Sequence, residues 1–313
     1  MEILNSCPIC KGQKFKPFLL CTDFTVSRET FQIVECESCN FHFTNPRPNE
    51  IEITRYYQSE DYISHTGTSK GLVNRIYLLV RKYTLAKKLQ LVLEENFRGN
   101  SSKLKNLDSL ALMDYGCGTG EFLKTCKDAG IETTGIEPGE KAREFGINKY
   151  DLNILNPDKI KTIPSETFDI VTLWHVLEHI HQIEEFLNNL KRLLKKTGVA
   201  IIAVPNFISL DSKIYKENWA AFDVPRHLYH FSPKDMVNLM DGYDFKLEKT
   251  KPMIFDAFYV SMLSEKYKNS GIGKNNMVGN LISGFFSGLK SNVSAIKNEN
   301  SYSSLIYFFK KRH

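Results

Sequence analysis

The sequence predicts an α/β fold in which helices cover both faces of a mostly parallel sheet. Apolar strand-like segments alternate with amphipathic helical segments from residue 111 onward, and this alternation is typical of a doubly wound parallel sheet. A glycine-rich turn at 115–120, YGCGTG, joins the first strand of this series to its helix. Two CxxC pairs precede the series, and they predict a small metal-binding unit at the start of the chain.

Composition fits a globular enzyme. The chain has 313 residues, of which 42% are hydrophobic and 25% are charged, so it is long enough to bury a sizeable core. The net charge of +5 is too small to argue for nucleic acid, and we expect no nucleic-acid partner. We find no signal peptide and no apolar run long enough to span a bilayer. These features predict a cytoplasmic protein in a reducing compartment, whose seven cysteines do not form a disulfide framework.

Residues 1–48 are predicted to form a zinc ribbon. The CPIC and CESC motifs are separated by 25 residues, and each motif can turn two thiolates toward one point. Four thiolates leave no open coordination position, so the role of the metal would be structural. The alternative is a set of unligated, redox-active thiols. The predicted metal ligands are Cys7, Cys10, Cys36 and Cys39.

Residues 49–106 are predicted to be a helical lead segment followed by a linker. Apolar residues recur at helical spacing over 72–97, and lysines and arginines are mixed into the pattern. A basic amphipathic helix can lie on a membrane, but we favour a helix with one core face and one solvated face. The polar stretch that ends near residue 106 is typical of a linker.

The glycine-rich turn predicts a ligand-binding loop. An apolar strand carries Asp114 close to its end, and glycines follow at 116, 118 and 120 before a helix begins. The N–H groups at the start of that helix and the helix dipole would face the ligand. Glu137 closes a second apolar strand, where its carboxylate can accept hydrogen bonds from ribose hydroxyls. The spacing is GxGxG rather than the GxGxxG of dinucleotide-binding proteins, which argues against a dehydrogenase.

The strand–helix series continues to the end of the sequence. Gly130 and Gly198 end predicted helices, and a Ser cap followed by proline starts the helix at 232. We assign residues 107–252 and 301–313 to one core. The predicted strands are 112–116, 133–137, near 150–155, 168–176, 199–206, 245–252 and 303–311; the predicted helices are 121–129, 139–145, 181–196 and 232–242.

Residues 253–300 are predicted to be a lid-like insertion between the last two strands of the core. The insertion contains MIFDAFYVSMLSEKYK and NNMVGNLISGFFSGLK, two apolar stretches separated by a Gly/Asn-rich break. A helical lid that completes the core is the simpler interpretation. The alternative is a surface for a greasy acceptor or a peripheral membrane contact.

Four segments together give the chain a family resemblance. The cysteine pairs, LMDYGCGTGEF, FDIVTLWHVLEHI at 168–180 and DVPRHLYHFSP at 223–233 resemble class I S-adenosylmethionine-dependent methyltransferases. Within this class they are similar to the branch that bears a zinc ribbon and is related to ubiquinone-biosynthesis O-methyltransferases and sugar methyltransferases. The resemblance implies a Rossmann-like sheet of seven strands, with the last strand antiparallel and helices on both faces.

The resemblance also implies a cofactor site for S-adenosylmethionine. Asp114, Gly116, Gly118 and Gly120 would cradle its methionine end, and Glu137 would hold its ribose. In addition, the resemblance places Asp151 and Leu152 beside the adenine, and Trp174 and His175 beside the methyl group.

Histidines are the candidate catalytic residues. A sulfonium methyl group is already electrophilic, so a base is needed only when the nucleophile must lose a proton. His175, His227 and His230 follow two strands whose carboxyl ends lie at the ligand-binding edge of such a sheet. On a helix, His175, Glu178 and His179 would share one face, which leaves open a divalent metal there.

The sequence therefore predicts methyl transfer from S-adenosylmethionine to a small-molecule or lipid-linked acceptor. O-methylation is slightly preferred, because candidate bases are plentiful. One alternative is a sugar C- or N-methyltransferase. An alternative of another class is a nucleic-acid- or protein-modifying module that uses the ribbon as a reader. The sequence names neither the acceptor nor the oligomeric state.

Overall fold

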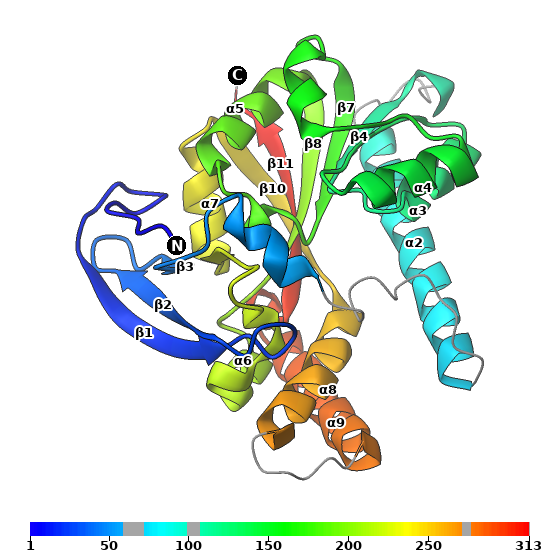
Figure 1. Cartoon of the computed structure of the whole chain (residues 1–313). Helices are drawn as coiled ribbons and strands as arrows, with labels where there is room; N and C mark the ends of the chain where they lie inside the picture. Colours follow the sequence, from blue (N-terminus) through cyan, green and yellow to red (C-terminus); the bar gives the residue numbers. More distant parts are fainter. Residues whose placement is uncertain (59–71, 99–106, 271–276, 313) are drawn as a thin grey trace.

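A computed structural model describes residues 1–58, 72–98, 107–270 and 277–312 of the chain. Its centre is a seven-stranded sheet (Figure 1). The sheet is parallel except for β11, which runs antiparallel to both of its neighbours. This architecture confirms the predicted α/β fold class. Across the sheet the order is β10 (Phe245–Pro252), β11 (Ser304–Lys311), β8 (Leu194–Pro205), β7 (Phe168–Trp174), β4 (Ala111–Tyr115), β5 (Glu132–Ile136) and β6 (Ile154–Leu155).

Both faces of the sheet are covered, because its strands are apolar at consecutive positions. Along β11, Tyr307 and Phe309 point into one core while Ile306 and Phe308 point into the other. The first core contains residues of α5 (Ile183–Leu193) and α7 (Pro233–Asp241), and the second contains residues of α2 (Leu72–Arg98) and α3 (Glu121–Asp128). A further helix, α4 (Glu140–Tyr150), connects β5 to β6.

Local sequence signals explain where these helices begin. Ser232 caps α7: its side chain accepts a hydrogen bond from the Asp235 N–H, and the Asp235 carboxylate accepts one from the Ser232 N–H. Pro233 occupies the first turn, where a missing N–H costs nothing. Short 3-10 helices complete the connections: η1 (Glu52–Tyr57), η2 (Leu107–Ser109), η3 (Pro157–Thr162), η4 (Leu177–His179), η5 (Lys216–Asn218), η6 (Ala220–Phe222) and η7 (Glu299–Ser301).

The N-terminal unit is an antiparallel sheet that shares a strand with the core. Three strands, β1 (Phe15–Thr22), β2 (Thr30–Cys36) and β3 (His42–Thr44), come from the predicted ribbon. The fourth, β9 (Tyr229–His230), comes from the loop that precedes α7, and it pairs with His42 and Phe43. Phe41 and Phe43 are fully buried in the same core cluster as α5 and α7. The ribbon and the core therefore share both a sheet and a hydrophobic core.

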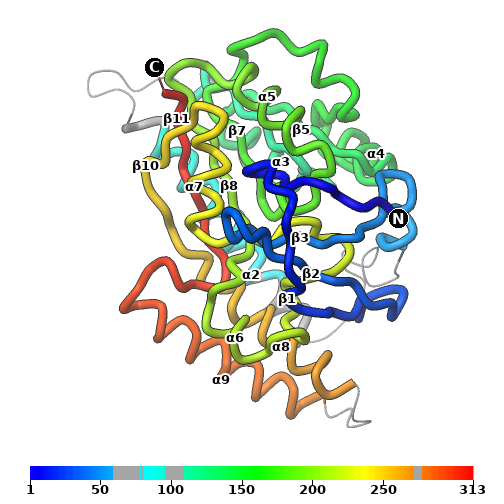
Figure 2. Tube along the Cα trace, turned by 90° about the vertical axis from the view of Figure 1, so that its left-hand side faces the viewer, coloured from blue at the N-terminus to red at the C-terminus, as the bar shows by residue number. Residues whose placement is uncertain are grey.

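Two helices lie between β10 and β11, where the insertion was predicted. They are α8 (Ile254–Ser270) and α9 (Met277–Ile296), and they lie side by side at one end of the sheet, beside α6 (Leu210–Tyr215) (Figures 1 and 2). No helix in the described part of the chain combines the length and hydropathy that are needed to cross a membrane. The predicted linker at 99–106 lies outside the described residues.

Candidate active site

The glycine turn between β4 and α3 requires glycine at three positions. Gly116, Gly118 and Gly120 have φ angles of 71°, 56° and 83°, in the left-handed region that disfavours other residues. A Cβ atom on Gly116 would lie 2.5 Å from a methyl carbon of Val176, and one on Gly120 would lie 2.5 Å from Leu152 Cδ1. At Gly118 a Cβ atom would meet nothing within 4 Å. The turn is packed at both ends and open in its middle, so a ligand can approach the backbone there.

Two carboxylates flank this turn. Glu137, at the carboxyl end of β5, accepts hydrogen bonds from the N–H groups of Gly118 and Gly139, both at 2.8 Å. Asp114 is buried in β4 and accepts a hydrogen bond from Thr172 Oγ1 at 2.6 Å. Burial raises the pKa of Asp114 to about 7. A cation that bound beside Asp114 would stabilise its charged form.

Lys88 of α2 reaches the same region and was missed by sequence reasoning. Its Nζ atom lies 4.5 Å from the centroid of the Trp174 ring, at the end of β7. Burial lowers the pKa of Lys88, whereas the charges of Asp114 and Asp256 oppose that shift. Trp174 packs edge-on against Phe122 of α3, and its Nε1 atom is buried without a hydrogen-bond partner in the described structure. Helical periodicity did not indicate that Lys88 lies in the site, because the amphipathic pattern places the lysines of this helix on its solvated face.

The residues expected beside an adenine lie at the start of β6. Asp151 ends α4 with a fully exposed side chain that pairs with Lys127 at 2.9 Å. Leu152 is buried against Gly120. Both residues precede β6, whereas ligands bind at the carboxyl ends of such strands. Asn156, which caps η3 directly after β6, occupies that edge and was not singled out from the sequence. Contact of Asp151 and Leu152 with an adenine stays a prediction.

His175, directly after β7, is held in an ion pair. Its φ angle is 58°, so the backbone turns sharply at this residue and does not continue as a helix. Its Nε2 atom lies 2.8 Å from Asp256 Oδ2 of α8, and its Nδ1 atom lies 3.4 Å from Glu178 Oε1. Burial lowers its pKa, but the two carboxylates outweigh burial and raise the pKa of His175 to about 10. His175 is therefore protonated at neutral pH.

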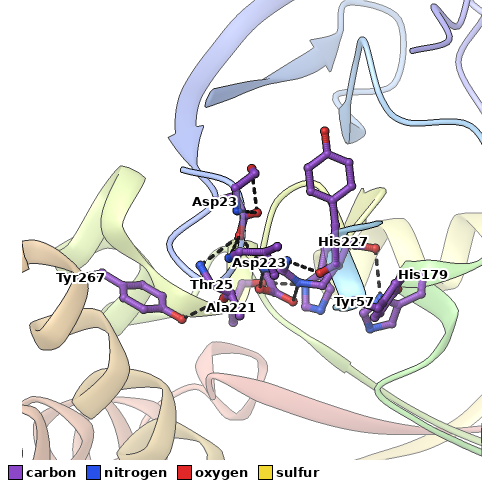
Figure 3. A network of polar contacts seen from close by, with 12 residues as sticks. Asp23, Thr25, Tyr57, His179, Ala221, Asp223, His227 and Tyr267 are labelled. Carbon is purple, nitrogen blue, oxygen red and sulfur yellow. Dashed lines mark hydrogen bonds and ion pairs between the residues drawn. The ribbon is translucent and has the colours of Figure 1, made fainter. Parts of the chain in front are cut away.

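His179 and His227 form a second group with Glu178. The Nδ1 atoms of His179 and His227 lie 3.0 and 2.9 Å from the carbonyl oxygens of Arg226 and Ala221. A carbonyl oxygen can only accept, so each Nδ1 carries a hydrogen, and a neutral ring then keeps a lone pair on Nε2. Burial lowers the pKa of His179 to about 4, so this ring is neutral at pH 7. Figure 3 shows the two rings close together, with Tyr57 also beside His179.

This group differs from the metal site expected from the sequence. Glu178, His179 and His227 each present a ligand atom within 4.8 Å of the others, whereas the His175 ring is paired with Asp256. The carboxylate of Glu178 is fully buried and makes no hydrogen bond within the described residues. One carboxylate and two imidazoles are ligands that suit a divalent ion. The group could therefore hold a metal, with His227 where the sequence pattern suggested His175.

His230, the third candidate catalytic residue, faces the ribbon. Thr44 Oγ1 donates a hydrogen bond to the His227 carbonyl at 2.9 Å and lies 3.1 Å from His230 Nε2. Burial holds the pKa of His230 well below its ordinary value. The structure brings His227 to the Glu178 group, and it places His230 in the contact between β9 and β3.

A buried charge cluster fixes the loop that carries His227. The Arg226 guanidinium is 1% exposed and donates hydrogen bonds to both carboxylate oxygens of Asp223, at 2.9 and 2.6 Å. It also donates to Asp23 of the ribbon at 3.0 Å and to the Tyr56 carbonyl at 2.9 Å. Figure 3 shows Asp23 and Asp223 around this centre. The ribbon thus holds the loop through side chains as well as through β9.

The four ribbon cysteines meet at one point. Cys7 Sγ lies 3.6 Å from Cys39 Sγ, and Cys10 Sγ lies 3.6 Å from Cys36 Sγ. All four sulfur atoms lie within 4.8 Å of one another. Tetrahedral zinc with Zn–S bonds of about 2.3 Å requires S···S separations of about 3.8 Å. The four residues therefore fit a structural zinc ion.

Comparisons with known proteins agree with this geometry. A family described as "Methyltransferase domain" matches residues 77–250. A ubiquinone biosynthesis O-methyltransferase of Pelagibacter ubique (strain HTCC1062) is 24% identical over 245 residues, which cover 71% of this chain and 98% of that protein. The protein of the same description from Rhodopseudomonas palustris (strain TIE-1) is 30% identical over 131 residues, 40% of this chain and 48% of that protein.

Among solved structures, a putative sarcosine dimethylglycine methyltransferase from Galdieria sulphuraria shares the fold. The TM-score is 0.50 at 13% sequence identity, with 78% of this chain and 92% of that chain covered. The glycine turn, the two flanking carboxylates and the seven-stranded sheet with its antiparallel last strand are those that the resemblance implied. The chain belongs to the methyltransferase domain family and is an S-adenosylmethionine-dependent methyltransferase.

Proposed function

We propose that the enzyme methylates a hydroxyl oxygen of a small-molecule or lipid-linked acceptor. The observation that carries this proposal is the pair of imidazoles at the end of β7. His179 and His227 both have Nδ1–H fixed by a backbone carbonyl, which leaves Nε2 free to accept a proton. A hydroxyl nucleophile needs such an acceptor, whereas a neutral amine attacks with its own lone pair. The relatives described as ubiquinone biosynthesis O-methyltransferases support the same reaction type.

The cofactor half of the site would position the methyl donor. In this proposal the Glu137 carboxylate exchanges its hydrogen bonds to Gly118 and Gly139 for bonds to the ribose hydroxyls. Asp114 would face the cationic end of the cofactor, and the Lys88 ammonium would pair with the methionine carboxylate. S-adenosylmethionine supplies an electrophilic methyl group, so alignment of donor and acceptor can contribute about 7–11 kcal/mol to catalysis.

His227 is the preferred proton acceptor. The proton on His175 is stabilised by Asp256 and Glu178, so the ring is already protonated at neutral pH and cannot accept another proton; its role would be to donate a hydrogen bond. At His179, burial opposes the charged form that the ring would take after accepting a proton. His227 lies beside both Glu178 and His179, and the buried Glu178 carboxylate would stabilise positive charge on either ring.

A divalent metal at Glu178, His179 and His227 would use the same free lone pairs. Such a metal would lower the pKa of a bound hydroxyl group. The backbone carbonyls of Arg226 and Ala221 accept the Nδ1 hydrogens, which would orient the two imidazoles with Nε2 toward a metal. Metal analysis of the purified protein distinguishes a metal-bound site from a metal-free general base.

Labelled methyl transfer into a host-cell extract tests the proposal. The wild-type protein should label a product whose methyl group is on oxygen. His227→Gln should lower transfer by about 10²–10⁴-fold, the usual contribution of a general base, with unchanged affinity for S-adenosylhomocysteine. His181→Gln is the matched control, because this histidine bonds the Pro48 carbonyl outside the group. A product methylated on carbon or nitrogen, or full activity of His227→Gln, would overturn the proposal.

A further inference from the structure

The distribution of polar and apolar side chains on α9 is the reverse of that on a helix at the surface of a protein in water. Large apolar side chains would normally face the protein and small polar ones the solvent. In α9 the buried positions are small or polar: Asn280, Gly284, Gly288, Ser291, Asn292 and Ala295. The exposed positions include Met277, Val278, Leu281, Ile282, Phe285, Phe286, Leu289, Val293 and Ile296, which lie three or four residues apart on one side of the helix.

Close packing against α8 accounts for the small residues. A Cβ atom on Gly284 would lie 2.4 Å from Met262 Cα, and one on Gly288 would lie 2.8 Å from Phe258 Cα. The two glycines are four residues apart, and they let the helix backbones touch. This small-xxx-small contact is typical of helix pairs whose outer surface faces lipid, where burying large side chains between helices gives no advantage.

The apolar surface continues from α9 onto α8. Ile254, Phe255 and Tyr259 are each between 45% and 56% exposed, and Phe258 stacks on Phe285 with ring centroids 5.1 Å apart. We call the exposed residues of α8 and α9 named above the hairpin face. Figures 1 and 2 show both helices at one end of the molecule. A continuous apolar surface of this kind marks a contact site, unlike apolar residues scattered singly.

The exposed charged side chains of the two helices are of one sign, and the exposed acidic residues nearby, Glu217 of η5 and Glu299 of η7, lie on neighbouring elements. Within 254–270 and 277–297, the exposed charged side chains are Lys266, Lys268, Lys290 and Lys297. The two acidic residues in these ranges are used inside the protein. Asp256 pairs with His175, and Glu265 accepts a hydrogen bond from Tyr215 at 3.0 Å. An apolar surface with a cationic margin complements an anionic lipid surface.

We propose that the hairpin face docks on the surface of an anionic lipid bilayer. The helices lie in the interface without crossing it, in keeping with the finding that no helix among the described residues is long and apolar enough to cross a membrane. A second copy of the chain is a poorer occupant, because a two-fold contact would bring the same lysines toward each other. Asp256 joins α8 to His175, so docking places the active site next to the bilayer. The docking proposal stands on the hairpin face and does not depend on the acceptor.

Vesicle flotation of the full-length protein tests the docking. Vesicles of phosphatidylcholine with phosphatidylglycerol should carry the protein, and pure phosphatidylcholine should carry less. The double variant Ile282→Ser/Phe286→Ser should reduce binding roughly tenfold or more, because it removes apolar area that the bilayer covers. Leu20→Ser/Ile51→Ser is the matched control, because these exposed apolar residues lie outside the hairpin face. Lys290→Gln should weaken binding to the anionic vesicles about fivefold.

Two further measurements keep this test separate from that of the enzyme activity. Affinity for S-adenosylhomocysteine should be the same in the wild type and in both double variants, so a failure of cofactor binding reports on the methyltransferase assignment alone. Sedimentation velocity without vesicles should show that Ile282→Ser/Phe286→Ser leaves the oligomeric state unchanged. The proposal is overturned if no vesicle binds the protein, or if this variant instead converts an oligomer into a monomer.

Discussion

The two halves of the proposed active site are built in different ways. The proposed cofactor half lies in one stretch, from Asp114 to Glu137, that contains the glycine turn, α3 and β5, and the backbone of its glycines carries most of its geometry. The acceptor half collects side chains from the ribbon, η1, the end of β7, the loop at 223–230 and α8. A local backbone device can be recognised from spacing alone, whereas a site assembled by tertiary contacts depends on how distant elements pack.

The halves also differ in what stabilises them. Left-handed glycines form the cofactor half at little cost, because they need no partner side chain. In the acceptor half, Arg226 places a buried cation between Asp23 and Asp223. A buried charge is costly unless its partners are all present. We therefore expect ribbon damage to affect the acceptor half while sparing the cofactor half.

Zinc removal should have the largest effect. Structural zinc sites contribute about 10–16 kcal/mol of binding free energy, so a chelator or Cys36→Ser should unfold the four-stranded sheet. Hydrogen exchange should accelerate in β3 and β9, while β4 stays protected and S-adenosylhomocysteine still binds. Metal analysis of the untreated protein should find about one zinc per chain in the ribbon. If cofactor binding is lost when the ribbon unfolds, the expectation that the two halves are stabilised separately is contradicted.

The substitution Arg226→Met should have the second-largest effect. It leaves the buried Asp23 and the half-buried Asp223 without their cation, which should lower the free energy of unfolding by about 3–5 kcal/mol in urea titrations. The control is Arg55→Met, because Arg55 forms an exposed pair with Glu29 and should contribute less than about 1 kcal/mol. Adding Asp23→Asn to Arg226→Met should recover part of the loss. Equal effects at positions 226 and 55 would show that the buried cluster does not stabilise the loop.

Glu137→Ala tests the cofactor half. Two hydrogen bonds from ribose hydroxyls to a carboxylate are worth about 3 kcal/mol together, so the Kd for S-adenosylhomocysteine should rise roughly hundredfold in calorimetry. Thermal stability of the ribbon should not change. Glu140→Ala, at the exposed start of α4, is the control and should leave the Kd nearly unaltered. An unchanged Kd in Glu137→Ala would mean that the ribose lies elsewhere.

His42→Phe should have the smallest effect, and one that depends on pH. His42 lies between Phe18 and Phe207, and burial lowers its pKa to about 4. Between pH 6.5 and 4 the unfolded chain binds a proton that the folded chain does not, so stability falls as pH falls. The variant should remove up to about 1.4 kcal/mol per pH unit of this dependence. Urea titrations at pH 7.5, 6 and 5 measure it, and identical slopes in both proteins would contradict the assignment.

The sequence predicted most of the fold, because its signals are local. Alternating strands and helices, the glycine turn and the Ser232 cap each depend on neighbouring residues, and the structure has all of them. The CxxC spacing predicted four sulfurs at one point, and they meet there. The seven strands with an antiparallel last strand followed from the resemblance, and they are confirmed as well.

The acceptor half could be predicted only in part. Helical spacing joined His175 to Glu178 and His179, but the left-handed backbone at His175 turns that ring toward Asp256 of a distant helix. His227 and His230 are three residues apart and have different surroundings, because β9 pairs His230 with the ribbon. Lys88 carried no signal, since nothing local distinguishes a lysine over Trp174 from one in solvent.

The position of β11 constrains the order in which this chain can fold. β8 and β10 are not paired with each other, and both pair with β11, so Pro205 finds its partner Ser304 only after α8 and α9 have been synthesised. Closing so long a loop is entropically slow, and contacts of this kind lengthen folding times. During that interval the apolar residues of α9 have emerged before the sheet is complete. A nascent chain in this state would be a natural client for a chaperone. Pairing of β11 with β8 and β10 would complete the sheet and release the chain from the chaperone.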